Sequence, residues 1–281
     1  MSLVTTPATT TEPVGASWHP VRHPHVDILG IPVTSATRAA ITADLLDGLR
    51  SPADRCHLLF FVNAHGCNVA FRDAAYARAL GQATWILNDG IGMEIAARAC
   101  GRRFAENLNG SDLIDEGDVL RRCADEGIPV FLLGARPETL ERAILGYQGR
   151  YPGLIVAGAH HGYFDHDDDD AAREISARIG RSGARVLLAG LGVPLQEIWL
   201  ARHRSQLPCR LAIALGGSLD QVAGDVPRAP RIWIRLRLEW LFRLFQEPRR
   251  LWRRYLLGNV VFLARVALRR RGLYGTTTGA P

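Results

Sequence analysis

The stretch ARVLLAGLGVPLQEIWLARHRSQLPCRLAIALGG (184–217) contains two short apolar runs separated by a longer amphipathic segment. The runs at 184–192 and 209–217 have the length and the Leu, Val and Ile content of strands buried on both faces, and 194–207 has the length of a helix. Parallel neighbouring strands need such a long crossover connection. The stretch therefore predicts a strand–helix–strand unit of a parallel sheet.

The same alternation continues toward the amino terminus and extends this unit into a larger sheet. Further strands are predicted at HLLFFVNA (57–64), TWILND (84–89), IPVFLLGA (128–135) and LIVAGAH (154–160), and further helices at 111–126, 136–150 and 168–182. Apolar residues make up 47% of the chain, which is enough to bury a sizeable core. We expect an α/β core over residues 25–226, with a mostly parallel sheet and helices on both faces.

Arginine is concentrated beyond this core. Residues 228 to 271 include thirteen arginines and two acidic residues, so this segment carries about +11 of formal charge and the rest of the chain about −5. Trp233, Leu236, Trp240 and Leu244 recur at helical spacing among these arginines. We expect residues 227–271 to form a basic amphipathic helical appendage.

An anionic membrane surface is the partner that this charge favours. The apolar run at 255–268 has only 14 residues and contains Arg265, so it is too short to span a bilayer and suits the interface. Nucleic acid is not predicted, because no helix-turn-helix, zinc-finger or RNP pattern accompanies the charge. An ordinary core-docking helix with a solvated basic face remains the alternative.

Both ends of the chain are predicted to be tails. Residues 1–24 are rich in Thr and Pro and poor in large apolar residues, so we expect them to be disordered, and we expect 272–281 to be flexible. The amino terminus lacks the basic start and continuous apolar run of a secretory signal. These features favour a cytoplasmic protein that is peripheral on the inner face of the plasma membrane.

Small and polar residues follow the predicted strands, where open α/β sheets bind their ligands. They are Asn63, Asp89, Gly134, Gly190, Gly192, Gly216 and Gly217. Glycine lets a backbone approach a ligand closely, and the N–H groups that begin a helix can hold phosphate. This edge suits a diphosphate, although a glycine at a strand end often only makes a turn.

No metal site is predicted. The five cysteines form no CxxC pair, and the nine histidines include no HExxH or similar ligand spacing.

Several blocks of sequence together resemble one family. They are VNAHGCNVAFRD (62–73), LNDGIGMEIAAR (87–98), NGSDL (109–113), FLLGARPETLERA (131–143), YPGLIVAGAHHGYF (151–164), GLGVPLQEIWLARHR (190–204), GGSLDQVAGDVPRAP (216–230) and LEWLFRLFQEPRRLWRRYL (238–256). In this order and at these separations they are similar to the WecG/TagA/CpsF family of bacterial glycosyltransferases, over about residues 27 to 268.

The resemblance implies a Rossmann-like core and inverting, metal-independent transfer without a cofactor. The donor would be a UDP-sugar and the acceptor an undecaprenyl-diphosphate-linked sugar, in the synthesis of exopolysaccharide or teichoic-acid-type polymers. It also implies that the basic appendage docks on the membrane and helps to complete the active site. The oligomeric state is left open, and a homo-oligomer is compatible with the sequence.

The resemblance also implies roles for residues of the candidate site. Asp89 matches the proposed base and Asn63 an asparagine that faces a sugar, although either side chain also suits a turn or a helix cap. Gln196 and Glu197 match a block that handles the nucleotide, and Asp220 suits ribose or its own loop. Arginines suit the diphosphates of both substrates; the candidates are Arg228, Arg249, Arg250, Arg253 and Arg254.

Two positions depart from the family pattern. Phe61 stands where many members have Thr, and Asn107, a candidate substrate contact, stands where many have Arg. The donor sugar is therefore left open between N-acetylmannosamine, its uronic acid and glucose. A non-catalytic, membrane-peripheral nucleotide-binding module is the alternative function. A nucleotide-binding oxidoreductase is disfavoured, because GLGVPL lacks the third glycine of GxGxxG.

Overall fold

The computed structural model describes residues 23–50, 55–115, 118–235 and 238–270. The predicted tails at 1–24 and 272–281 lie outside these ranges, apart from residues 23 and 24.

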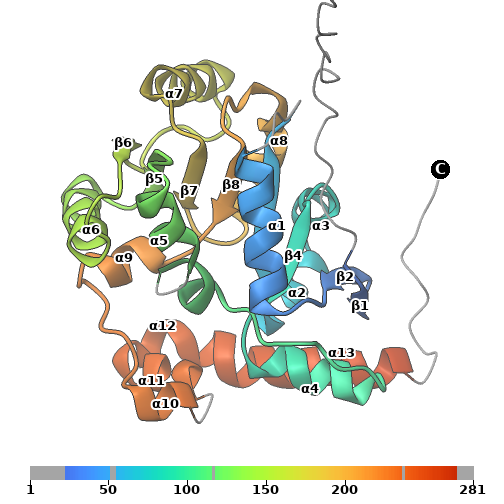
Figure 1. The fold of residues 1–281 in the computed structure, drawn as a ribbon. Coiled ribbons are helices and arrows are strands. Elements are labelled where there is room, and N and C mark those ends of the chain that lie inside the picture. The colour runs from blue at the N-terminus through green and yellow to red at the C-terminus, as the bar shows by residue number, and fades with distance from the viewer. Residues whose placement is uncertain (1–22, 51–54, 116–117, 236–237, 271–281) are drawn as a thin grey trace, which may run out of the picture.

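Eight strands of the described chain form one sheet, in the order β1-β2-β4-β3-β8-β7-β5-β6 (Figure 1). They are β1 (His25–Ile28), β2 (Ile31–Thr34), β3 (His57–Val62), β4 (Trp85–Asn88), β5 (Val130–Gly134), β6 (Val156–His160), β7 (Val186–Gly190) and β8 (Leu211–Ala214). The pair β1 and β2 is antiparallel, and the other neighbours are parallel. All six predicted strands are present, and the mostly parallel α/β fold is confirmed.

The amino-terminal hairpin of β1 and β2 is the part of the sheet that the apolar runs did not predict. Each strand has only four residues. In β1 only every second residue is buried, so no continuous apolar run marks it. Leu29 and Gly30 form its turn with φ values of 56° and 91°, the positive pair that a two-residue hairpin turn requires.

Helices cover both faces of the sheet, as predicted. The core helices are α1 (Arg38–Arg50), α2 (Ala64–Ala70), α3 (Ala74–Gly81), α4 (Ile91–Ala99), α5 (Asp118–Asp125), α6 (Pro137–Arg150), α7 (Asp169–Ser182), α8 (Leu195–Arg202) and α9 (Ser218–Val222). One face packs against α2, α3, α4, α7 and α8, and the other against α1, α5, α6 and α9. Within the predicted helix at 111–126, Ser111–Asp115 form a π-helical turn and Asp118–Asp125 form α5, while residues 116–117 lie outside the described ranges.

At the carboxyl edge of the sheet, the helices that follow neighbouring strands pack on opposite faces at several places. The pairs β3–β8 and β7–β5 are two of these places, and they are called the first and the second crevice below. Such switches between faces are where open α/β sheets bind ligands. Asn63 and Gly216 flank the first crevice, Gly134 and Gly190 flank the second, and Asp89 follows β4 beside the first.

The carboxyl-terminal segment forms the predicted helical appendage, which runs along one end of the core (Figure 1). It comprises α10 (Arg231–Arg235), α11 (Glu239–Gln246), α12 (Pro248–Trp252), a π-helical turn (Arg253–Leu257) and α13 (Gly258–Arg270). Helix α13 packs on α2 and α4 and buries Phe262 and Val266 in the core, while Leu257 and Val260 are exposed. The helix therefore docks on the core and also keeps an apolar outer surface.

Within the described ranges, no helix is both long enough and apolar enough to cross a bilayer.

Candidate active site

Asp89 and Asn63 form the centre of the site. The register of β3 and β4 pairs Val62 with Asn88, so the next residue of each strand lies at the same edge. Asn63 Nδ2 donates a hydrogen bond to Asp89 Oδ2 at 3.1 Å, and Asn63 Oδ1 accepts one from the Gly66 N–H at 3.1 Å. Asn63 thus caps α2 and also orients the aspartate.

Asp89 does not cap the helix that follows it. The N-cap position of α4 is Gly90, which has φ 84° and no side-chain capping bond. Burial raises the pKa of Asp89 above its ordinary value, although the Asn63 bond and the charges of Arg254 and Arg243 oppose this rise. The carboxylate is therefore oriented by an amide and faced by cations, which suits a proton acceptor.

Arg243 and Arg254 are the cations that face Asp89, and both come from the appendage. Each side chain is partly buried, and the Nε atoms of both are buried without a hydrogen-bond partner. Burial lowers the pKa of the Arg254 guanidinium. An ideal Cβ atom on Gly217 would lie 3.6 Å from Arg243 Nη2, which places this guanidinium over the loop after β8. The two arginines have unused donors for an anion.

The other candidate arginines are either paired with a carboxylate or exposed. Arg228 Nη2 is 2.9 Å from Asp112 Oδ1. Arg249, Arg250 and Arg253 are exposed. Arg250 pairs with Glu247 at 2.8 Å, and its charge partly opposes the rise in the pKa of Asp220 that burial causes. The Arg253 guanidinium lies 5.3 Å from the centroid of the Trp252 ring.

The glycines at the strand ends divide into two kinds. A Cβ atom on Gly134 would collide with the Gly190 carbonyl, and one on Gly190 would lie 2.9 Å from Leu219 Cδ1. Close packing therefore requires glycine at positions 134 and 190. Gly192 and Gly216 have φ values of 84° and 61°, and a Cβ atom there would meet nothing within 4 Å. These two loops therefore leave open space beside their backbone.

Gln196 lies behind these two open loops and joins them. Its Oε1 accepts hydrogen bonds from the N–H groups of Gly192 at 3.2 Å and Gly216 at 3.0 Å, and its Nε2 donates to Glu197 Oε1 at 2.8 Å. Gln196 is 2% exposed and Glu197 is fully buried. Burial raises the pKa of Glu197 to about 7. In this structure both side chains support the loops from inside.

Asp220 and Asn107 border the site on different sides. Asp220 follows the Gly217 loop, and burial and then the charge of Asp225 raise its pKa. Asn107 Oδ1 accepts a hydrogen bond from Asn88 Nδ2 at 3.3 Å, directly beside Asp89. A Cβ atom on Gly110 would lie 3.4 Å from the Phe61 ring, so glycine makes room for this ring.

The structure adds residues that the sequence analysis did not select. Arg243 stands in the EWLFRLFQEPRR block and Asp112 in the NGSDL block, but no local signal separates them from their neighbours. Glu239 also belongs to the site, because burial and then the charges of Asp112 and Asp89 raise its pKa. Arg243, Asp112 and Glu239 can be assigned to the site only from their proximity to Asp89 in the folded structure. Among the described residues, no group of three His, Cys, Asp or Glu side chains is arranged to hold a metal ion.

Comparisons with known proteins identify the family of this chain. Residues 26–275 match the profile of the Glycosyl transferase WecG/TagA/CpsF family. Two similar proteins are the N-acetylglucosaminyldiphosphoundecaprenol N-acetyl-beta-D-mannosaminyltransferases of Staphylococcus aureus strains MW2 and NCTC 8325 / PS 47. Each is 30% identical to this chain over 246 residues, which cover 88% of this chain and 93% of the relative. The chain belongs to the WecG/TagA/CpsF family and is a glycosyltransferase.

Proposed function

We propose that this protein transfers a sugar from a UDP donor to an undecaprenyl-diphosphate-linked sugar, with inversion and without a metal or other cofactor. The observation that carries the proposal is one arrangement: Asp89, oriented by Asn63, faces Arg243 and Arg254 across the carboxyl edge of the sheet. The named relatives act on a diphosphoundecaprenol-linked sugar, which supports the acceptor class.

Asp89 is the proposed base. Asn63 holds Oδ2, which leaves Oδ1 to accept the proton of the acceptor hydroxyl as that oxygen attacks the anomeric carbon. The bond from the anomeric carbon to the UDP oxygen breaks on the opposite face, so the configuration inverts. The raised pKa of Asp89 makes it a stronger base than an ordinary aspartate.

Arg243 and Arg254 are proposed to stabilise the departing diphosphate. A planar guanidinium matches phosphate oxygens in geometry and charge, and these two already have buried Nε atoms without partners. Arg243 lies over Gly217, where a nucleotide diphosphate would pass between the two crevices. Fixed positive charge near the leaving group lowers the barrier without a metal.

The donor sugar is proposed to be N-acetylmannosamine, its uronic acid or glucose. The relatives transfer N-acetylmannosamine. Phe61 and Asn107 line the edge beside Asp89 and depart from the family pattern. The uronic acid and glucose are therefore proposed as donors alongside N-acetylmannosamine.

The test is a screen of these three UDP-sugars with a polyprenyl-diphosphate-linked N-acetylglucosamine, with and without EDTA, read by mass spectrometry of the lipid product. We expect one donor to give an elongated lipid at the same rate in EDTA. Binding of UDP without transfer from any donor would instead support a non-catalytic module.

The appendage is proposed to rest on an anionic membrane surface. Leu256, Leu257, Val260 and Leu263 are exposed along the outer side of the π-helical turn and α13. Exposed Arg253 and Arg270 lie on the same segment, and exposed Arg249 lies on the preceding α12. These arginines suit anionic head groups. Deleting the appendage is not a clean test, because Phe262 and Val266 belong to the core.

Point substitutions test this membrane contact. We expect Leu257→Ser with Val260→Ser to weaken co-sedimentation with phosphatidylglycerol vesicles by at least about tenfold, since two apolar side chains leave the interface. Leu145→Ser is the matched control, because Leu145 is 69% exposed on α6, outside the appendage. Wild-type binding by the double variant would contradict the proposed surface.

A further inference from the structure

Asn68 connects the core to the appendage in the middle of α2. Its side chain is buried, with 6% of the residue exposed. Asn68 Nδ2 donates a hydrogen bond to the Gly258 carbonyl at 2.7 Å, and Asn68 Oδ1 accepts one from Arg265 Nη1 at 2.6 Å. A carbonyl only accepts and a guanidinium only donates, so this amide orientation satisfies both partners. One side chain of the core thus binds α13 at two points.

Arg265 is held by a second contact as well. Its guanidinium carbon lies 3.9 Å from the centroid of the Phe71 ring, which directly follows α2. A cation stacked on an aromatic face adds to the hydrogen bond from the same side chain. Asn68 and Phe71 together hold Arg265 against the end of α2.

Gly258 lies where the appendage changes its helical form. The Gly258 N–H donates to the Arg253 carbonyl and so closes the π-helical turn that contains Arg254. π-helical turns are rare and often lie at functional sites. Gly258 lies four residues after Arg254, and Asn68 lies five residues after Asn63, which orients Asp89. The bond between Asn68 and the Gly258 carbonyl therefore joins the two sides of the site.

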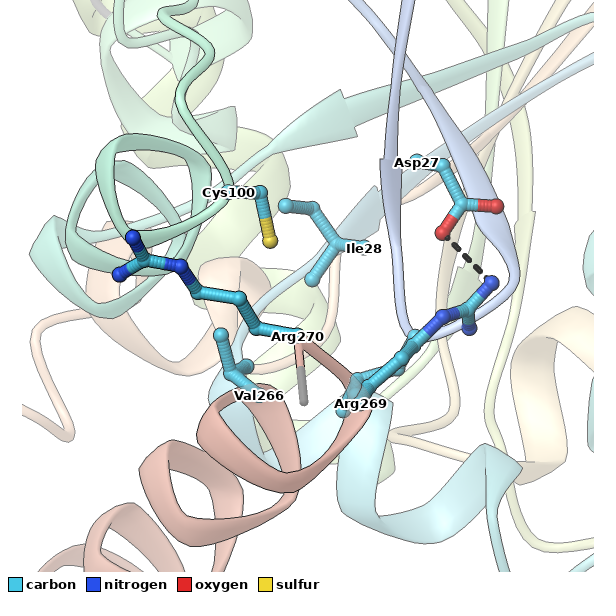
Figure 2. Close-up of a pocket in the computed structure, with 7 residues that line it drawn as sticks. Asp27, Ile28, Cys100, Val266, Arg269 and Arg270 are labelled. Atoms are coloured by element: carbon cyan, nitrogen blue, oxygen red, sulfur yellow. Dashed lines mark ion pairs between the residues drawn. The ribbon is translucent and has the colours of Figure 1, made fainter. Parts of the chain in front are cut away.

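The far end of α13 is attached more weakly. Arg269 Nη2 lies 3.0 Å from Asp27 Oδ1, and the ion pair borders a cavity of about 210 Å³ between α13 and the amino-terminal hairpin (Figure 2). The Asp27 side chain is 57% exposed and that of Arg269 is 32% exposed. Solvent screens such a pair, so it contributes little. This ion pair offers a matched control on the same helix.

We propose that Asn68 and Arg265 form a latch that positions Arg254 opposite Asp89, with Asn68 as a positioning residue for the transfer reaction. The proposal rests on the proposed function for its effect on rate, but the latch itself is testable without turnover. If the latch opens, the π-helical turn loses its attachment to α2 and Arg254 loses its fixed place near the base.

A double-mutant cycle on kcat/KM tests the coupling. We expect Asn68→Ala to lower kcat/KM by about tenfold, the scale of a lost hydrogen bond to a charged group. In an Arg254→Gln background, Asn68→Ala should lower kcat/KM by less than about twofold, because there is no longer an Arg254 side chain to position. Asp27→Asn should stay within about twofold in both backgrounds. A tenfold loss from Asn68→Ala in both backgrounds would overturn the positioning role.

Hydrogen exchange provides the readout that does not depend on activity. In Asn68→Ala we expect amide exchange over residues 253–266 to accelerate at least about tenfold, while exchange in β5 and β7 stays unchanged. If Asn68→Ala does not fold, Asn68→Asp serves instead, because it keeps the acceptor for Arg265 and removes the donor to Gly258. Unchanged exchange over 253–266 in the folded variant would refute the latch, even if no donor supports transfer.

Discussion

Asp89 and Asn63 stand at the ends of adjacent buried strands, whereas Arg243 and Arg254 stand on helices that join the core through few side chains. Every residue of β4 is buried, but neither α11, which carries Arg243, nor the π-helical turn, which carries Arg254, has a buried residue. Regions with few buried contacts open at lower free-energy cost. The base is therefore fixed by the sheet, and the cations are brought to it by a more weakly attached layer.

Asp89→Asn gives the largest expected effect, because it removes the base from the rigid side of the site. We expect kcat to fall by about 10²- to 10⁴-fold while UDP binding stays within about twofold. Asparagine keeps the shape and a partner for Asn63 but accepts no proton. Steady-state rates and UDP titration measure the two quantities, and an unchanged kcat would contradict the base assignment.

Glu197→Gln tests the buried support under the same edge. The pKa of Glu197 is about 7 in the folded protein, against about 4.3 in an unfolded chain. Between these values the folded state keeps a proton that the unfolded state has lost, so the free energy of unfolding falls as pH rises, by about 4 kcal/mol in total. The variant should lose most of this slope.

Urea unfolding at about pH 5 and pH 7.5 measures this difference for the wild type and the variant. Asp168→Asn is a suitable control, because Asp168 caps α7 and accepts its capping bond from the Asp170 N–H, outside Gln196 and the two open loops. An equal loss of stability with pH in wild type and Glu197→Gln would refute the assignment.

Arg254→Gln gives a smaller effect on rate, because Arg243 shares the same anion. We expect kcat/KM to fall by about ten- to thirtyfold, below the usual loss for a sole electrostatic donor. The Arg254 charge lowers the pKa of Asp89, so the acidic limb of the pH profile should move to higher pH in the variant. Arg249→Gln, an exposed neighbour on α12, should remain within about twofold of wild type.

If both arginine variants lose activity equally, the distinction between site-facing and solvent-facing arginines is wrong. If neither variant loses activity, the positive charges of the appendage do not stabilise the transition state.

Much of the fold and part of the site follow from local sequence. The six predicted strands form continuous apolar runs, and the residues after them had to lie at one edge once the strands ran parallel. The hairpin β1–β2 was not predicted because exposed residues interrupt both strands, so neither forms a continuous apolar run. Arg243 and Arg254 were not separable from Arg249 and Arg253, because helical spacing alone does not show which side of a helix meets the core.

The sequence by itself determined the parallel α/β core, the position of Asp89 and Asn63 at strand ends, and the concentration of positive charge after residue 227, since these depend on short-range patterns and on composition. Only the tertiary structure decided that Gln196 and Glu197 support the loops from inside, and that Asn68 holds α13. Only it decided which arginines face the base. These contacts join residues up to 197 positions apart, and packing in space, not periodicity along the chain, selects them.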